Sequence, residues 1–435
     1  MIRIYDDQEL TIEEILARDP APAREAEALV AEIIADVRRR GDEALFDYCR
    51  RFDHNRLEDL RVSGEEIEEA LRAAEPDLLE SLELAAANIR NFHKRQLRQG
   101  FVIAEEAGKI MGQRVLPLER VGIYVPGGTA AYPSTVLMNA IPAALAGVER
   151  IVMASPASAE GRLNPAVLAA AKVAGVTDIY KIGGAQAVAA LAYGTESVSR
   201  VDKIVGPGNL FVATAKRQVF GVVDIDMIAG PSEILAISDG TMEARILAAD
   251  LLSQAEHDKN AAAVLITTSP GQAREVQAEL ERQIPLLPRA GICREAIDKN
   301  GKIILTDTVA RAVEIANRIA PEHLELCLDD AFAWLPQIKH AGSVFLGKNA
   351  PEALGDYLGG PNHTLPTGGT ARFSSPLSVD DFIKKSSFIY YSRDALADVE
   401  KNIRLLARAE GLEAHGQSVA ARFDRIRDLR KQVRS

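Results

Sequence analysis

Short apolar runs alternate with amphipathic helical patterns from Val115 to about residue 350, and this alternation limits the fold more than any other feature of the chain. The first block predicts strands over residues 121–125, 150–154, 178–182 and 203–205, with a helix after each strand. A second block of the same rhythm predicts strands over residues 233–237, 262–267, 302–306, 323–328 and 343–346. Strands that alternate with helices form parallel sheets whose two faces are both covered. We therefore predict an α/β fold with two open, mainly parallel lobes.

The N-terminal flank, residues 1–115, has a mainly helical pattern. Ser63 and Glu66 form the sequence signature of a capping box at the start of one of these helices. Nothing in the region suggests catalysis. His54 and His93 lie among charged residues, so we expect both to be exposed.

The alternation stops near residue 376, where a C-terminal flank begins. Residues 382–385 and 388–391 look extended or irregular, and helical patterns follow over 396–409 and 418–433. A tail of this kind packs on a neighbouring lobe or subunit more often than it folds alone.

The sequence divides into four predicted domains. Residues 1–115 form a helical N-terminal region and residues 116–229 a first α/β domain. Residues 230–375 form a second α/β domain, which can include parts of the N-terminal region, and residues 376–435 form a helical tail. In open α/β sheets ligands bind at the carboxyl ends of the strands, so we expect a site there, in a cleft between the lobes.

Charge and composition exclude several classes of partner. The 435 residues carry a formal net charge of −11, and the basic segment 422–434 has the pattern of a solvated amphipathic helix, so we expect no nucleic-acid partner. The longest apolar run, 135–148, is interrupted by polar and proline residues and is too short to span a bilayer, and the first residues resemble no signal peptide. The three widely spaced cysteines fit reduced, buried thiols. We expect a cytoplasmic protein without a membrane segment.

Two polar pairs are candidates for chemistry. Gln254 and His257 lie three residues apart at the end of a predicted helix over 242–257, so they share one face. Glu322 and His323 stand side by side where a predicted helix gives way to a strand, and they could supply two general bases. Taken alone, each pair fits an ordinary solvated or helix-capping pair better than a site.

Two later segments add acidic groups and histidines. The glycine-rich loop 355–363 carries an aspartate and a histidine, and residues 410–415 lie where the first tail helix breaks. Each has a plain structural alternative, a loop or an exposed helix end. Together these segments offer a set of metal ligands that contains only nitrogen and oxygen atoms: Gln254, His257, Asp356 and His415. Such a set suits Zn²⁺, and Mn²⁺ or Co²⁺ would also accept it.

Glycine-containing turns follow three of the predicted strands, at residues 125–128, 182–186 and 205–209. Backbone N–H groups at the start of a helix can bind phosphate. None of these turns reads G-x-G-x-x-G with an acidic residue about twenty positions later, so the ordinary dinucleotide fingerprint is absent. The spacing alone is equally compatible with three structural turns and with a nucleotide-binding site.

Longer motifs run through nearly the whole chain in a fixed order: VGIYVPGG (121–128), GGAQA (183–187), VDKIVGPGN (201–209), AGPSE (229–233), DLLSQAEH (250–257), PEHL (321–324), AGSVFLG (341–347), GDY (355–357) and NHTLP (362–366). In this order they resemble the histidinol dehydrogenase family, although the first hundred residues resemble it only loosely. The resemblance implies incomplete Rossmann-like lobes and a homodimer. It also implies a zinc- and NAD-dependent oxidation of L-histidinol to L-histidine, through the aldehyde, in the last steps of histidine biosynthesis.

The resemblance also assigns roles to single residues. One Zn²⁺ per subunit would be held by Gln254, His257, Asp356 and His415. His323 would be the base that removes the alcohol proton, and Glu322 would activate the water that attacks the aldehyde. Positions that match contacts to NAD are Tyr124, Gln186 and Asn209. The substrate would be contacted by Ser232, His363 and Glu410 as well as by the zinc ligands and His323. In the family the tail of one subunit helps to complete the site of the other, and none of the matched positions departs from the family pattern.

Two other classes of function stay open on composition alone. A zinc hydrolase or deaminase that uses Glu322 to activate water on a histidine-like substrate would turn over without NAD. A non-catalytic module of two lobes that closes on an imidazole ligand would have no turnover to lose when Glu322 or His323 is replaced. Only the order of the motifs ranks the dehydrogenase first.

Overall fold

The structure is a computed structural model that describes residues 1–423 except 17–20 and 128–130. Gly128, the last residue of the first glycine turn, therefore lies outside the described residues. So does the part of the predicted helix over 418–433 that begins at residue 424.

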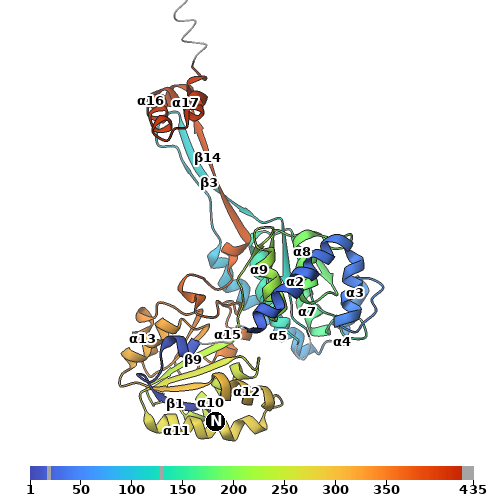
Figure 1. The fold of residues 1–435 in the computed structure, drawn as a ribbon, viewed down its shortest axis with the longest axis vertical. Coiled ribbons are helices and arrows are strands. Elements are labelled where there is room, and N and C mark those ends of the chain that lie inside the picture. The colour runs from blue at the N-terminus through green and yellow to red at the C-terminus, as the bar shows by residue number, and fades with distance from the viewer. Residues whose placement is uncertain (17–20, 128–130, 424–435) are drawn as a thin grey trace, which may run out of the picture. The chain divides into compact units, whose positions relative to one another are not determined.

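Contacts divide the chain into two compact units, each formed by two segments of sequence. The larger, which we call the main unit, comprises Met1–Leu97 and Pro117–Phe382, and the small unit comprises Arg98–Leu116 and Ile383–Ser435. The main unit contains two parallel sheets and the small unit contains a third sheet (Figure 1). The α/β class and the mainly parallel sheets with helical flanks are confirmed.

The first lobe of the main unit is a five-stranded sheet in which every strand is parallel to its neighbours. Its order is β6-β5-β4-β7-β8, with bounds Arg120–Tyr124 (β4), Arg150–Ala154 (β5), Asp178–Tyr180 (β6), Lys203–Val205 (β7) and Asp224–Ile225 (β8). The chain runs outward from β4 through β5 to β6 and then returns to the other side of β4 as β7. The strand order therefore reverses between β4 and β7, which is where an open α/β sheet forms a crevice at its carboxyl edge.

Alternate residues of these strands belong to two cores, one on each face of the sheet. Ile151 and Met153 of β5 join one core and Val152 and Ala154 join the other, because successive side chains of a strand point to opposite faces. The first face is covered by α4 (Gly64–Ala73), α5 (Pro76–His93), α6 (Pro133–Ala146) and α7 (Pro165–Ala174). The second is covered by α2 (Ala21–Arg40), α3 (Asp42–Phe52), α8 (Gly184–Tyr193) and α9 (Leu210–Val219).

The second lobe is a six-stranded parallel sheet of order β1-β11-β10-β9-β12-β13. Its strands are β1 (Arg3–Asp6), β9 (Glu233–Ser238), β10 (Ala262–Thr267), β11 (Lys302–Leu305), β12 (His323–Cys327) and β13 (Ser343–Leu346). One face is covered by α10 (Ala244–Ala255), α11 (Pro270–Gln283) and α12 (Ala290–Asn300), and the other by α1 (Ile12–Leu16), α13 (Val309–Ile319) and α14 (Ala331–Trp334). A short helix, α15 (Glu352–Tyr357), follows β13. The 3₁₀ turns of the main unit are η1 (Lys94–Gln96), η2 (Ile284–Leu286), η3 (Leu335–Gln337), η4 (Thr370–Arg372) and η5 (Val379–Phe382).

The N-terminal flank contributes a strand to this lobe, which the helical prediction for residues 1–115 does not include. β1 pairs with β11 in parallel, with Arg3 opposite Lys302. Ile2, just before β1, is buried in the core of that lobe. Four residues at the edge of a sheet carry too little periodicity to be recognised, and their partner strand lies about 300 positions away in the sequence.

Within the N-terminal helices, one local prediction is confirmed and another is wrong. The capping box exists: Ser63 Oγ accepts from the N–H of Glu66 (3.1 Å), and Glu66 Oε2 accepts from the N–H of Ser63 (2.9 Å). His54 is exposed as expected, but His93 is buried. His93 continues the apolar face of α5 at helical spacing after Leu82, Ala86 and Ile89, so its position on the helix decides its burial and the charged sequence neighbours do not.

The small unit combines strands from both ends of its sequence. β2 (Phe101–Ile103) pairs antiparallel with β3 (Lys109–Pro117), and the sheet order is β14-β3-β2. β14 (Ile383–Tyr391) is one continuous strand where the sequence suggested two extended or irregular pieces. The tail then forms α16 (Arg393–Ala409) and α17 (Glu413–Ala420), which pack on each other.

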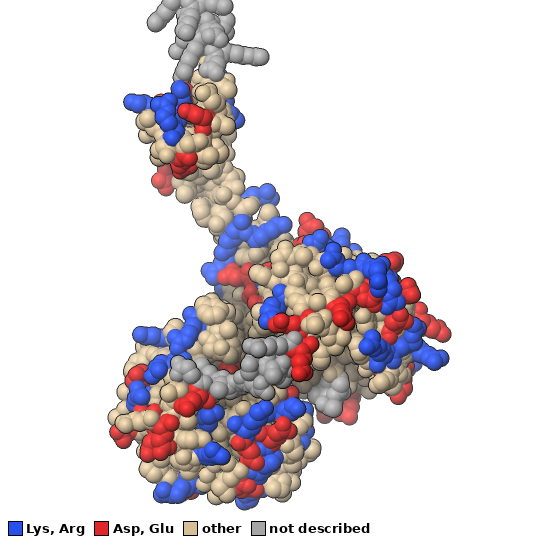
Figure 2. Space-filling view, viewed as in Figure 1, with Lys and Arg blue, Asp and Glu red and all other residues tan. Residues whose placement is uncertain are grey.

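The surface charges, the helices and the cysteines of the structure can be compared with what the composition predicts. On the face drawn in Figure 2, basic and acidic side chains are interspersed over the main unit. No helix among the described residues is long and apolar enough to cross a membrane. All three cysteines, Cys49, Cys293 and Cys327, are buried free thiols, which confirms that prediction.

Candidate functional site

The predicted site residues of the second lobe lie at the amino edge of its sheet and not at the carboxyl ends of its strands, where a site was expected. His323 is the first residue of β12, Glu322 precedes it, and Ser232 directly precedes β9. Helix α10 runs antiparallel to the strands, as the helix of a parallel crossover must, so its last turn returns to the amino edge. That turn carries Gln254.

Gln254 and His257 come from the C-terminal end of α10. The helix ends at Ala255, two residues before the predicted end, and His257 follows in a tighter turn in which its N–H donates to the carbonyl of Gln254 (3.2 Å). The Gln254 side chain is buried, and its Oε1 receives no hydrogen bond from any described residue. A buried amide oxygen without a donor costs free energy unless a cation or another donor meets it.

Helix α15 supplies two carboxylates, Glu352 and Asp356, four residues apart and therefore on one face. The ligand atoms of His257, Glu352 and Asp356 all lie within 4.8 Å of one another. The hydroxyl of Ser253 donates to Glu352 Oε2 (2.6 Å) and holds that carboxylate in place. Glu352 is not among the ligands predicted from the sequence, although its four-residue spacing from Asp356 is a signal that points to it.

One ring nitrogen of His323 forms a hydrogen bond, and the other has no hydrogen-bond partner among the described residues. Its Nδ1 lies 3.0 Å from the carbonyl oxygen of Glu233, so Nδ1 carries the proton and donates to that oxygen. Its buried Nε2 has no hydrogen-bond partner among the described residues and lies 3.7 Å from Asp356 Oδ1 and 4.0 Å from Glu352 Oε1. The second ring nitrogen of His323 is therefore directed at the carboxylates of α15.

Glu322 lies on the Nδ1 side of the same imidazole. Its Oε2 accepts from the N–H of Glu233 (2.8 Å) and lies 3.6 Å from His323 Nδ1. Burial raises the pKa of Glu322 to about 8. Glu322 and His323 are thus two adjacent, differently anchored titratable groups.

Negative charge accumulates in this region. Among the described residues, no Lys or Arg forms a salt bridge with any of five carboxylates: Asp250, Glu322, Glu325, Glu352 and Asp356. Burial lowers the pKa of His323, but the charges of Glu322, Asp356 and Glu352 outweigh it and raise that pKa to about 10. Buried and partly buried carboxylates without a basic partner favour a divalent cation, and the donors of Gln254, His257, Glu352 and Asp356 fit one in chemical type.

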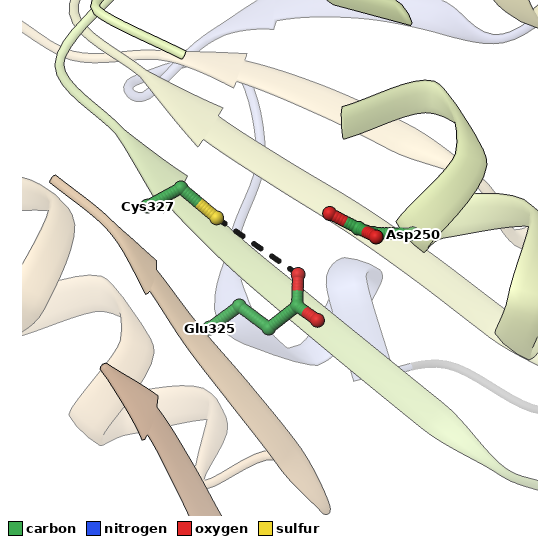
Figure 3. Close-up of side chains that lie close together, drawn as sticks. All are labelled: Asp250, Glu325 and Cys327. Carbon is green, nitrogen blue, oxygen red and sulfur yellow. Dashed lines mark hydrogen bonds between the residues drawn. The ribbon is translucent and has the colours of Figure 1, made fainter. Parts of the chain in front are cut away.

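A second group next to this set consists of the buried Glu325 and Cys327 and the partly buried Asp250, whose side chains point toward one another (Figure 3). The Cys327 thiol donates to Glu325 Oε2 (3.9 Å), and Glu325 Oε1 accepts from the N–H of Glu352 (2.8 Å). Burial raises the pKa of Glu325 to about 8 and that of Asp250 to about 6. Glu325 therefore ties the first residue of α15 to β12 and supports the carboxylates that α15 presents.

His363 connects α15 to the first lobe. Its Nδ1 lies 3.0 Å from the carbonyl oxygen of Asp356, and its Nε2 lies 3.4 Å from the hydroxyl of Thr135 on α6. Burial lowers the pKa of His363. The side-chain amide of its neighbour Asn362 donates to the carbonyl of Met138 (2.6 Å), also on α6. The predicted substrate-binding loop is therefore fixed to both lobes.

A pocket of about 960 Å³ lies at the carboxyl edge of the first sheet, where ligands were expected. Tyr124, Gln186 and Asn209, the three positions predicted to meet NAD, all line it. The Tyr124 hydroxyl accepts from the N–H of Gly184 (3.0 Å), and Asn209 Oδ1 accepts from the N–H groups of Phe211 and Val212 at the start of α9 (3.1 Å each). Two of the three residues thus also shape the turns that form the pocket.

Glu410 and His415 belong to the small unit. Glu410 is the residue after α16, and His415 lies in the first turn of α17, where its N–H donates to the carbonyl of Leu412 (3.0 Å). Both side chains are exposed. The structure therefore brings His257 and Asp356 together within the main unit, while the fourth predicted zinc ligand, His415, belongs to the other unit.

Comparisons with known proteins place this architecture in a family. The sequence pattern of the family described as histidinol dehydrogenase matches residues 16–423. A histidinol dehydrogenase from Syntrophotalea carbinolica is 56% identical over 423 residues, 96% of this chain and 98% of that protein, and one from Bacillus thuringiensis subsp. konkukian is 56% identical over 91% of this chain and 92% of its own. A crystal structure of histidinol dehydrogenase from Elizabethkingia anophelis superposes with a TM-score of 0.89 at 37% identity, covering 98% of both chains. The chain therefore belongs to the histidinol dehydrogenase family.

Proposed function

We propose that this protein oxidises L-histidinol to L-histidine through the aldehyde, with two NAD and one water consumed for each histidinol, as the last steps of histidine biosynthesis. One observation carries the proposal. His323, whose buried Nε2 has no hydrogen-bond partner among the described residues, lies between a second proton acceptor, Glu322, and the carboxylates of Glu352 and Asp356, which are grouped with His257. A reaction that must remove protons from an alcohol and from a water needs two such acceptors side by side.

His323 is the base for the alcohol step. Because its Nδ1–H is committed to the carbonyl of Glu233, the neutral imidazole is the tautomer whose Nε2 accepts a proton. A cation bound among the neighbouring carboxylates would offset the charges that raise the pKa of His323 and so favour this neutral form. That nitrogen takes the hydroxyl proton of histidinol as hydride leaves the adjacent carbon. NAD, bound in the pocket lined by Tyr124, Gln186 and Asn209, supplies the hydride acceptor.

Glu322 is the base for the aldehyde step. Its carboxylate is anchored by one hydrogen bond from the Glu233 N–H, and it can accept a proton from a water molecule that attacks the aldehyde carbon. A pKa raised to about 8 by burial makes it a stronger base than an ordinary carboxylate. The hydrated aldehyde would then give up a hydroxyl proton and a second hydride, the hydride to a second NAD, which yields the acid.

Gln254, His257, Asp356 and His415 would hold Zn²⁺. When bound, zinc supplies a positive charge that orients the imidazole and amine of the substrate and offsets the surrounding carboxylates. Ser232, His363 and Glu410 contact the substrate beside it. Glu352 keeps its carboxylate next to this set through its hydrogen bond from Ser253.

We further propose a cytoplasmic homodimer with shared sites, in which Glu410 and His415 of one chain serve the site of the other. Support comes from apolar side chains that the small unit leaves exposed on its sheet and on α16: Phe101, Val102, Ile103, Ile389, Leu405 and Leu406. A surface of this kind is typical of an interface with another subunit.

The first test follows NADH absorbance with L-histidinol and NAD, before and after chelation and after zinc is returned. Two NADH for each histidinol, lost on chelation and restored by zinc, are expected. Absence of NAD reduction by the zinc-loaded protein would reject the proposal. Release of product from a histidine-like substrate without NAD would then favour a hydrolase or deaminase, and binding without turnover would favour a closing module.

A further inference from the structure

The dinucleotide pocket has an acidic wall residue that the sequence analysis did not single out. Asp53 follows the last residue of α3, and its backbone N–H donates to the carbonyl of Cys49 (3.0 Å). It lines the pocket together with Tyr124 and Gln186. Its Oδ2 is buried and receives no hydrogen bond from any residue that the structure describes.

An unpartnered carboxylate oxygen at a pocket wall calls for a donor from the ligand. A buried acceptor without a donor is costly, and the cost is removed when a hydroxyl or amine of a bound molecule reaches it. Burial raises the pKa of Asp53 to about 6, so that the group is still mostly ionised at neutral pH. Asp53 is therefore a mostly ionised carboxylate among the residues that line the pocket.

The position of Asp53 along the sheet indicates which part of a dinucleotide it meets. The side-chain amide of Asn55, two residues later, donates to the carbonyls of Ala157 and Ser158 in the loop after β5 (3.3 and 3.1 Å). The thiol of Cys49 donates to the carbonyl of Lys181 just after β6 (3.6 Å). Asp53 is thus held on the β5–β6 side of the crevice between β4 and β7.

In doubly wound sheets that bind NAD, an acidic side chain near the end of the second strand accepts a hydrogen bond from the adenosine ribose 2′-hydroxyl. The second strand of this sheet is β5, and the residue that follows it is Ser155, which is not acidic. Helix α3 delivers Asp53 to the same edge from a different part of the chain.

The basic residue among those that line the pocket, Arg162, forms an exposed salt bridge with Glu69 (2.8 Å). The carboxylate of Asp53 in the same wall suits an unmodified ribose better than a phosphorylated one, because it repels a second negative charge.

We propose that Asp53 determines cofactor specificity: its carboxylate accepts a hydrogen bond from the 2′-hydroxyl of the adenosine ribose and repels the 2′-phosphate of NADP. This inference rests on the proposed use of a dinucleotide in this pocket. It adds the residue that selects NAD over NADP.

The test is calorimetric binding of ADP-ribose and of 2′-phospho-ADP-ribose to the zinc-loaded protein, for the wild type, Asp53→Asn and Asp53→Ser. Asp53→Asn keeps the size of the side chain and removes its charge. We expect it to weaken ADP-ribose binding by about tenfold, because a charge-assisted hydrogen bond is lost, and to weaken binding of the phosphorylated ligand less or to strengthen it. Glu58→Gln is the matched control, because it removes an exposed carboxylate nearby that does not line the pocket and should leave both affinities unchanged.

Unchanged ADP-ribose affinity in folded Asp53→Asn and Asp53→Ser would overturn the inference, as would an equal loss for both ligands. A wild type that binds neither ligand would also overturn it. Because binding needs no turnover, a failure of the oxidation reaction is recognised separately, by the absence of NADH from histidinol in the wild type. Steady-state kcat/KM for NAD and NADP then checks that the selectivity measured in binding also governs catalysis.

Discussion

Single residues decide what the buried polar groups of this protein can do, and His93 is an example outside the site. Its Nδ1 lies 2.7 Å from Gln96 Oε1, its Nε2 is buried without a partner among the described residues, and burial lowers its pKa. The unfolded chain, in which histidine has its ordinary pKa of 6.5, therefore binds a proton more readily than the folded protein. The contribution of His93 to stability is complete above that pKa and falls as the pH drops through it.

Replacement of His93 by Met is accordingly expected to reduce the pH dependence of folding. Between pH 7.5 and 5.5 the free energy of unfolding in urea should fall less for His93→Met than for the wild type, because protonation of residue 93 no longer favours the unfolded chain. His340→Gln, which removes a partly exposed histidine of the same unit, should retain the wild-type slope. Parallel slopes for His93→Met and the wild type would show that His93 is not linked to folding.

Glu322→Gln separates the two halves of the proposed reaction. The amide oxygen of Gln can still accept from the Glu233 N–H, so the local structure should be kept while the proton acceptor is lost. The rate of NADH formation from L-histidinal should fall by about 100-fold or more, and that of the alcohol step, measured in a single turnover from L-histidinol, should fall much less. Equal losses in both half-reactions, with zinc content unchanged, would contradict the division of labour between Glu322 and His323.

At the scale of elements, short α15 owes its position to contacts with β12 and α10 rather than to helix propensity. Six residues are too few for a stable isolated helix, but Glu325 of β12 accepts from the N–H of Glu352, and Ser253 of α10 donates to the Glu352 side chain. Asp356 then stands on the same face, one turn later. The local sequence of α15 therefore contains the ligand but not the support that orients it.

Removal of that support should weaken metal binding without touching a proposed ligand. Glu325→Ala is expected to lower zinc affinity by about tenfold, measured by competition with a chromophoric chelator, because supporting residues typically contribute that much. Glu325→Gln retains an oxygen that can accept from the Glu352 N–H and should bind zinc almost as well as the wild type. If both variants bound zinc like the wild type, Glu325 would have no role in orienting α15.

For the whole molecule, the proposed sharing of sites between two chains has a numerical consequence. In a symmetric dimer with cross-chain sites, a hybrid of a Glu322→Gln chain and a His415→Ala chain contains one doubly altered site and one intact site. Random refolding of an equal mixture makes about half of the dimers hybrid, so about a quarter of the wild-type activity should return. Each variant refolded alone serves as the control. No recovery in the mixture would mean that each site is built within one chain.

Much of the architecture could be predicted from local pattern. The apolar runs that became β4, β5, β9, β10, β11 and β12 are continuous because both faces of a parallel strand are buried, and the capping box at Ser63 and Glu66 is a contact between residues three apart. Strands β1, β3 and β14 were not recognised as such, because they lie at a sheet edge or in a small, half-exposed sheet and pair with segments far along the chain.

The sequence by itself determined the α/β class, the family, and the chemical types of the candidate ligands and bases, because these depend on composition, periodicity and the order of motifs. Only the tertiary structure decided which groups act together. It engaged Nδ1 of His323 and left Nε2 free, added Glu352 to the donor cluster, buried His93, and set Asp53 in the wall of the pocket. Each of these depends on which groups from distant segments exclude water and satisfy hydrogen bonds, and no local pattern encodes such contacts.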